Sequence, residues 1–307
     1  MSDLEKIKKL QSILKISKTN YQVRRELAVL LLNKGFNEEA LAQFLYLSRI
    51  FSDDAGIFYN LGITYEKLKN LDKAAEAYRN ALDIDINDID SHFNLGLVYI
   101  DKKEFSKAIE HLKIVLICDE EDCNAYFSLG LAYFKLKEYS LAKENLIKAI
   151  DLNCDDIYAH FYLANIYKDE NEIELAIEEF NKVLEISTDY SWAYFNLASI
   201  YFEQNDFSSA INYLDKTLEY NPKDLEAYKI YVKILMGEEK YDDAMQIIDK
   251  AVKNCRDIGD LYYIRAKIYM KKNNIERAKK NLGKALKFYA TLSLSPKDVK
   301  KELDSMQ

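Results

Sequence analysis

Apolar side chains follow a helical period along the chain and are interrupted by short polar turns. In residues 55–68 and again in residues 72–85, apolar or small residues recur three and four positions apart, which is the spacing of one helix face. These residues are Phe58, Leu61, Gly62 and Tyr65 in the first stretch, and Ala74, Ala77, Tyr78 and Ala81 in the second. The pattern predicts a helix (helix A), a turn at LKNLD and a second helix (helix B).

The pair of stretches recurs with a fixed period of 34 residues in eight copies, without insertion or deletion. The residue that marks the period in helix A is Ala28, Gly62, Gly96, Gly130, Ala164, Ala198, Val232 or Ala266. Twelve residues later every copy has an alanine, at Ala40, Ala74, Ala108, Ala142, Ala176, Ala210, Ala244 and Ala278. Because only two prolines and eight glycines occur in 307 residues, the repeat predicts an all-α chain of stacked copies.

The glycine inside helix A needs a reason, because glycine in a helix interior costs about 1 kcal/mol relative to alanine. A small residue where two helices cross lets their backbones approach, since side chains set the distance between helix axes. We therefore expect Gly62 and Ala74 to lie where helix A crosses helix B, with Leu61, Tyr65 and Tyr78 filling the space around them.

This arrangement of residues resembles the tetratricopeptide repeat family, over residues 21–292. The resemblance implies a right-handed α-solenoid superhelix of helix-turn-helix repeats. The chain departs from the family pattern near the end of each repeat, where proline is common but only Pro222 is present, so helix B is expected to run on at the other junctions. Arg24, Val232 and Arg265 also stand at positions that are usually apolar or small.

The 34-residue frame divides the chain into a cap, eight repeats and a second cap. Residues 1–20 are expected to form an N-terminal capping helix with Leu4, Ile7, Leu10 and Leu14 on one face, and residues 293–307 a C-terminal one that begins near Ser295 and Pro296. The eight repeats are residues 21–54, 55–88, 89–122, 123–156, 157–190, 191–224, 225–258 and 259–292. Capped ends of this kind are expected of a complete array.

Charge and composition narrow the class of partner and the compartment. The net charge of −8 argues against nucleic acid as a partner. Residues 1–36 and 256–307 are nevertheless basic. Two basic ends would disfavour head-to-tail stacking of chains. The alternative is that acidic residues simply gather in the turns between the repeats of the middle. No segment approaches the roughly 20 apolar residues of a membrane span, and the start of the chain has no apolar signal region. We expect a cytoplasmic protein without membrane insertion, whose four cysteines are reduced thiols, although a Cys118–Cys123 disulfide stays open.

The sequence contains no motif for catalysis, for a cofactor or for a metal. The segment 83–94 begins like a calcium loop but has Asp88 and Asn94 where a glycine and a glutamate are required. His92 and His160 stand at positions held by aromatic residues in other repeats, so they are expected to be packing residues. His111 is expected on helix B without a Cys or His partner. We therefore predict a protein that is not an enzyme.

The family resemblance implies that helix A lines the concave groove of the superhelix. Large aromatic residues and asparagines recur at the positions that would face it, which suits an extended peptide or an amphipathic helix. The candidate binding residues are Tyr59, Asn60, Phe93, Asn94, Phe127, Phe161, Tyr162, Trp192, Phe195 and Asn196. Pure packing of these residues against neighbouring helices is the alternative.

The resemblance also allows one family function to be rejected. Members that bind a chaperone's terminal carboxylate use a basic clamp, whereas here Asp260 and Ile264 follow Lys229 and Lys233 where further partners are needed. The leading prediction is a scaffold or adaptor that binds a partner protein in its groove. The alternatives are a self-assembling structural protein, which would be a homo-oligomer, and a regulatory subunit of an enzyme on another chain.

Overall fold

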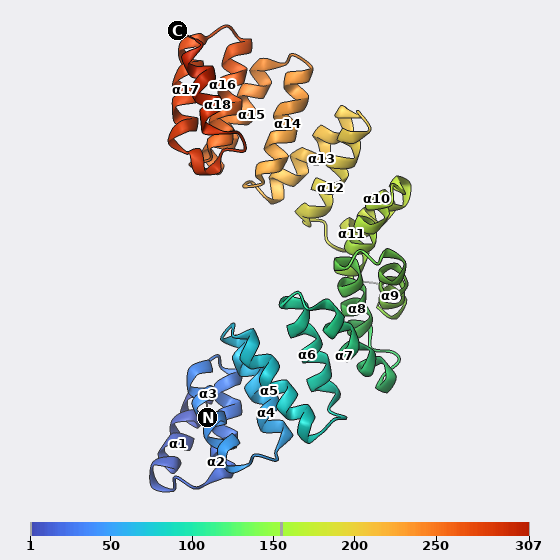
Figure 1. Ribbon diagram of the computed structural model, residues 1–307, viewed down its shortest axis with the longest axis vertical. Helices are drawn as coiled ribbons and strands as arrows, with labels where there is room; N and C mark the ends of the chain where they lie inside the picture. The colour runs from blue at the N-terminus through green and yellow to red at the C-terminus, as the bar shows by residue number, and fades with distance from the viewer. Residues whose placement is uncertain (1, 154–155, 307) are drawn as a thin grey trace. The chain divides into compact units, whose positions relative to one another are not determined.

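The computed structural model describes residues 2–153 and 156–306, and within them it contains 18 α-helices, one 3-10 helix and no strand. Helices A and B of the second copy appear as α4 (Ala55–Lys67) and α5 (Leu71–Ile84), each within one residue of the predicted range. The prediction of an all-α chain is confirmed (Figure 1).

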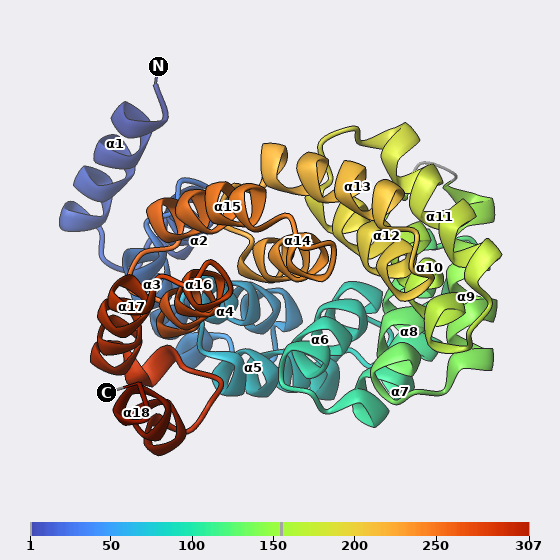
Figure 2. The same ribbon diagram turned by 90° about the horizontal axis from the view of Figure 1, so that it is seen from above.

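The chain forms two compact units, Met1–Ile166 and Tyr167–Gln307. The other helices of the first unit are α1 (Asp3–Ile16), α2 (Tyr21–Asn33), α3 (Asn37–Ile50), α6 (Ile89–Asp101), α7 (Phe105–Cys118), α8 (Cys123–Lys135), α9 (Tyr139–Leu152) and the first part of α10 (Ile157–Asp169). The second unit continues through α11 (Ile173–Ile186), α12 (Ser191–Glu203), α13 (Phe207–Tyr220), α14 (Leu225–Gly237), α15 (Tyr241–Asn254), α16 (Gly259–Lys271), α17 (Ile275–Lys287), the 3-10 helix η1 (Tyr289–Thr291) and α18 (Pro296–Asp304). Helices A and B of one copy pack side by side, as α4 with α5 and α16 with α17 (Figure 2).

The glycines of helix A allow close contact with helix B. A Cβ atom on Gly62 would overlap Cε1 of Tyr78, and one on Gly96 would lie 2.9 Å from Cγ of Leu112. Both approaches are closer than a van der Waals contact, so a side chain at either position would displace its neighbour. The predicted close approach is confirmed, although the atoms nearest to Gly62 belong to Tyr78 rather than to Ala74.

The turn from helix A to helix B has the same backbone conformation in all eight copies. The residue in the left-handed region is Gly35, Lys69, Lys103, Lys137, Asn171, Asn205, Glu239 or Asn273, with φ between 55° and 79°. In the second copy the next N–H, that of Asn70, donates to the carbonyl of Tyr65 at 2.9 Å. This bond satisfies a carbonyl at the helix end, so the turn is fixed by backbone bonding even where glycine is absent.

The expectation that helix B runs on where proline is missing is wrong. Helix α5 ends at Ile84 and α7 at Cys118, which is the same repeat position as Tyr220, where α13 ends before Pro222. The residue that follows α5 or α7 is extended; Asp85, for example, has φ −130° and ψ 96°. A few residues later a new helix begins, and aspartates such as Asp224 accept its first backbone N–H groups. This sharp turn and the cap of the next helix end helix B without proline.

The two end helices bury narrow apolar faces. In α1, Ile7, Leu10 and Leu14 are buried, whereas Leu4, which was predicted on the same face, is 59% exposed. Leu4 lies in the first turn of α1, a helix that packs mainly against α2. In α18, Ser295 caps the helix as predicted and Val299 is 1% exposed.

None of the helices in the described parts of the chain is long and apolar enough to cross a membrane. Cys118, Cys123 and Cys255 are free thiols. Cys154 lies outside the described residues.

Candidate functional site

Five aromatic residues of the first unit form a cluster on α8 and α10, which we call the aromatic surface. It consists of Phe127, Phe134, Tyr158, Phe161 and Tyr162. The ring of Tyr162 lies at its centre, 5.3 Å from that of Phe134 and 6.1 Å from that of Phe127. Lys135 places its ammonium 5.4 Å from the Phe134 ring, and burial raises the pKa of Tyr162. Tyr158 is 57% exposed, so the surface offers aromatic area to a partner.

A second contact of the first unit joins α4 to α6. Asn94 donates its side-chain amide to the hydroxyl of Tyr59 at 3.3 Å. Asn60 instead donates to the carbonyl of Gly56 in its own helix at 2.6 Å. Phe93 is half-buried and makes no aromatic ring contact with the described residues. The asparagine amides of this unit are therefore partly used within the fold.

In the second unit, α12 carries one exposed aromatic residue beside one buried amide. Trp192 is 57% exposed, whereas Asn196 is 7% exposed. The Asn196 amide donates to the carbonyl of Trp192 at 2.8 Å, and its oxygen accepts from Nζ of Lys168 at 2.5 Å. Burial lowers the pKa of Lys168. Asn196 thus binds the half-buried side chain of Lys168. Phe195, the next predicted residue, is partly buried and packs against the core of this unit.

The structure brings some of the ten sequence-predicted residues together and leaves others apart. Phe127, Phe161 and Tyr162 share the aromatic surface, while Tyr59 and Asn94 share a hydrogen bond. The remaining predicted residues are Asn60, Phe93, Trp192, Phe195 and Asn196, of which the last three lie in the second unit. Their role as one binding site stays a prediction.

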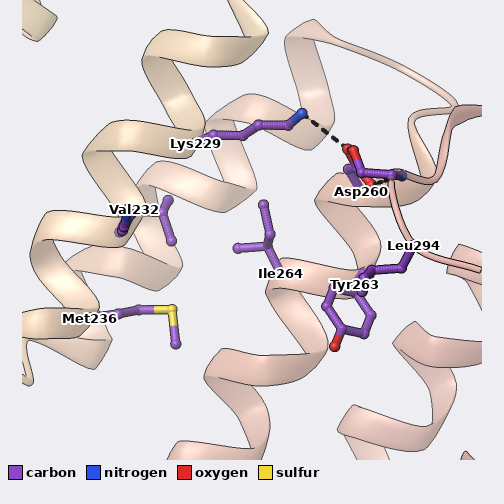
Figure 3. A pocket seen from close by; sticks show the side chains of 9 residues that line it. Lys229, Val232, Met236, Asp260, Tyr263, Ile264 and Leu294 are labelled. Carbon is purple, nitrogen blue, oxygen red and sulfur yellow. Dashed lines mark hydrogen bonds and ion pairs between the residues drawn. The ribbon is translucent and has the colours of Figure 1, made fainter. Parts of the chain in front are cut away.

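A cavity of about 490 Å³ opens in the second unit between α14, α16 and the segment that precedes α18 (Figure 3). We call it the α14–α16 pocket. Its lining residues are Lys229, Val232, Lys233, Met236, Asp260, Tyr263, Ile264, Ser293 and Leu294. Most of this lining is aliphatic or aromatic, with Met236, Ile264 and Leu294 half-buried or exposed. A concave apolar site with few polar groups is the usual form of a ligand pocket.

Hydrogen bonds to a buried carboxylate fix one wall of the α14–α16 pocket. Asp260 accepts from the backbone N–H of Ser293 at 2.7 Å and from its hydroxyl at 2.5 Å, and it pairs with Lys229 at 3.0 Å (Figure 3). Burial opposes ionisation of Asp260, but these hydrogen bonds hold its pKa below the ordinary value. Lys229 is thereby neutralised within the fold. Lys233, in contrast, has no ion pair in the described parts of the chain and places its ammonium 5.0 Å from the Phe202 ring.

Sequence reasoning missed most of this pocket. Val232 stands where other copies have glycine or alanine, which was a signal that the helix packing changes there. Leu294 and Ser293 follow the last repeat, so the 34-residue period could not align them with α14. Their place over the pocket follows from the hydrogen bonds to Asp260.

The prediction that His111 has no histidine partner is wrong. Nδ1 of His111 on α7 lies 2.8 Å from Nδ1 of His92 on α6. His92 is 2% exposed, and its Nε2 lies 3.0 Å from the carbonyl oxygen of Ile86. The described residues place no third His, Cys, Asp or Glu with the pair in an arrangement that could hold a metal. The pair is therefore a packing contact between the two helices of one copy, with a proton shared across it.

Comparison with known proteins identifies the repeat. Family profiles described as tetratricopeptide repeat match residues 55–88, 89–113, 124–155, 169–234, 201–257 and 259–291. No curated protein matches the chain.

Solved structures share the fold. The crystal structure of MamA aligns with this chain at 30% sequence identity and a TM-score of 0.50. The alignment covers 54% of this chain and 97% of the MamA chain. A MamA structure (residues 41 to the end) from Desulfovibrio magneticus RS-1 is 26% identical over 56% of this chain and 97% of its own, with a TM-score of 0.54. YrrB, described as a TPR protein with an unusual peptide-binding site, is 24% identical over 60% and 95% of the two chains, with a TM-score of 0.50, which shows the fold alone.

These matches agree with the 34-residue period, the packed pairs of helices A and B, and the glycines at their crossings. The architecture is a helical repeat solenoid. The chain belongs to the tetratricopeptide repeat family, whose members are generally non-catalytic scaffolds for protein–protein interaction.

Proposed function

We propose that this protein is a non-enzymatic scaffold that binds a segment of a partner protein through its A helices. The observation that carries the proposal is the α14–α16 pocket, because it is an apolar concavity of about 490 Å³ lined mainly by residues of two A helices. An apolar side chain placed there would remove both surfaces from water, which stabilises a complex in proportion to the area buried.

The charge beside the pocket suggests the chemistry of the segment. Lys229 is already paired with Asp260, whereas Lys233 is exposed and has no carboxylate partner among the described residues. A carboxylate on the partner, one turn from the inserted apolar side chain, would complement Lys233 and orient the segment. The proposed ligand is therefore an apolar residue flanked by an acidic residue.

The aromatic surface of the first unit is proposed as a second contact surface. Its rings are large and stiff, so they lose little entropy on binding. The ring centroids of Phe127 and Tyr162 lie 6.1 Å apart, and that of the exposed Tyr158 lies 6.4 Å from that of Phe127. Within the second unit, the exposed Trp192 is the strongest hot-spot candidate of the predicted set.

The test compares what different variants capture from a lysate of the source cell. Tagged wild type, Lys233→Glu and Leu294→Ser would serve as baits, with Ile275→Ser as a matched control because Ile275 is exposed at 45% and lies outside the pocket. We expect the same proteins with wild type and the control, and their loss with both pocket variants while circular dichroism stays helical.

Two outcomes would contradict the proposal. Recovery of the bait alone, with a mass by light scattering that rises with concentration, would favour the self-assembling alternative. Equal capture by every variant would mean that the pocket does not bind the partner. Capture of an enzyme whose turnover changes on binding would instead favour a regulatory subunit.

A further inference from the structure

Arg265 interrupts a column of buried apolar residues that recurs in every other copy of the repeat. The corresponding residues in the other seven copies are Leu27, Leu61, Leu95, Leu129, Leu163, Leu197 and Tyr231. All seven are buried, with exposures from 0% to 8%. In the eighth copy the same position on α16 holds a guanidinium group, which costs free energy to bury unless it is paired. The substitution needs a compensating partner.

The protein pairs this guanidinium group only in part. Nη2 of Arg265 pairs with Asp249 of α15 at 2.8 Å, and the side chain is 23% exposed. Its Nε is buried and has no hydrogen-bond acceptor in the described structure. A buried donor that is left unpaired is destabilising, so the protein does not fully compensate this guanidinium group. The exposed part of the side chain remains open to an acceptor from outside the chain.

Further cations surround the same point. A cavity of about 190 Å³ is lined by Arg265, Tyr269, Arg277, Lys280, Asn281 and Lys284. Arg265 and Arg277 lie 6.0 Å and 5.7 Å from the Tyr269 ring, so both guanidinium groups gather at one aromatic side chain. Arg277, Lys280 and Lys284 form no ion pair within the residues that the structure describes. Four cations therefore line one small cavity, and among the described residues the one carboxylate in an ion pair with any of them is that of Asp249, which lies outside the lining.

We propose that this cavity between α16 and α17 binds a phosphate-type oxyanion. Guanidinium groups present forked N–H donors that match the oxygens of phosphate, and lysine ammonium groups add charge. The cavity is about six times the ~30 Å³ that one water molecule occupies in the liquid, which leaves room for a tetrahedral anion with some of its water. The ligand is free inorganic phosphate or a small phosphate monoester, since both present the same group.

Arg24 in the first copy shows that an unusual arginine does not by itself make such a site. Its Nε is also unpaired, but its terminal nitrogens donate to Gln43 at 2.5 Å and to the carbonyl of Lys18 at 2.9 Å. The cavity beside it is also lined by Glu39, a carboxylate that offsets the basic residues. The cavity at Arg265 has no carboxylate in its lining.

Thermal unfolding and isothermal calorimetry with inorganic phosphate test the site, with sodium chloride at equal ionic strength as the reference. A parallel arm uses glycerol 3-phosphate to distinguish free phosphate from a monoester. The variants are Arg265→Leu, which introduces the residue of six other copies and should fold, and Arg277→Gln. Lys271→Gln is the matched control, because Lys271 is an exposed cation of α16 outside the cavity.

We expect phosphate to raise the melting temperature of wild type and of Lys271→Gln, and to leave that of Arg265→Leu unchanged. Arg277→Gln should weaken binding by roughly tenfold or more, because a hydrogen bond to a charged group contributes on that order. The absence of a phosphate effect on wild type would overturn the proposal. An equal effect on Arg265→Leu, or an equal loss with Lys271→Gln, would show general charge screening and would overturn it as well.

Discussion

His111 and His92 share one proton between their Nδ1 atoms, which lie 2.8 Å apart. Nε2 of His92 is 3.0 Å from the carbonyl oxygen of Ile86, which can only accept, so this nitrogen carries hydrogen. When both rings are neutral, Nδ1 of His92 is then the acceptor and Nδ1 of His111 the donor.

The histidine pair predicts a stability that falls in acid. Burial, followed by the charge of His92, lowers the pKa of His111 below its ordinary 6.5, although Glu110 opposes this. The folded state then binds fewer protons than the unfolded state, so the contribution to stability is present above about pH 6.5 and is lost as the pH falls below it. Melting temperatures between pH 8 and pH 5 check the sign.

Three tyrosines of the sixth copy supply the matched control for the histidine pair. Tyr194, Tyr201 and Tyr213 stand at the repeat positions of His92, Tyr99 and His111, and the rings of Tyr201 and Tyr213 stack with their centroids 5.4 Å apart. His111→Tyr should therefore pack, and its melting temperature should depend less on pH in this range than that of wild type. An unchanged pH profile would show that other groups dominate.

Gly96→Leu should destabilise the protein by about 1–3 kcal/mol, the usual cost of overpacking. The reason is that a Cβ atom added at Gly96 would lie 2.9 Å from Cγ of Leu112, a distance that helix α7 cannot increase without moving. Urea unfolding followed by circular dichroism measures the change. Gly283→Ala is the control, because nothing lies within 4 Å of its Cβ position and alanine favours a helix by about 1 kcal/mol.

Asn196→Ala should lower stability more than Asn60→Ala. The first change removes the acceptor of the half-buried Lys168 ammonium, and an unpaired buried donor costs roughly 1–3 kcal/mol. The second removes only a bond to Gly56 within one helix, so a change within about 0.5 kcal/mol is expected. Urea midpoints of the two variants decide the order, and equal values would contradict the structural role of Asn196.

Asp260→Ala should loosen the wall of the α14–α16 pocket. It removes both acceptors of Ser293 and leaves Lys229 with Glu226 as its remaining carboxylate partner. Hydrogen exchange of residues 289–304 should become faster, while exchange in the first unit stays as in wild type. Protection that persists in the variant would assign the wall to apolar packing instead.

The pH dependence of this wall follows from the pKa of Asp260, which is held below 3.8. The contribution of Asp260 to stability is therefore present above that pH and is lost only as the pH falls through the lower folded value.

The sequence alone determined the period, the helices and their crossings. A 34-residue frame can be read because every copy repeats the same local pattern, and local pattern is what forms a helix and its apolar face. Gly62, Gly96 and Gly130 could be assigned to close contacts because glycine inside a helix has few other uses. Ser295 with Pro296 likewise marked the start of α18.

Tertiary structure decided which side chains meet between elements. The His92–His111 contact, the bond of Lys168 to Asn196 and the place of Leu294 over the pocket join residues from different helices or from outside the repeat. A pattern along one copy gives the face on which a residue lies, but not the neighbour that reaches it from another helix. Arg265 shows the division most clearly. The sequence marked it as unusual, but only the packing of α16 against α17 placed it among the other cations. A cluster of charges depends on distances in space and not on spacing along the chain.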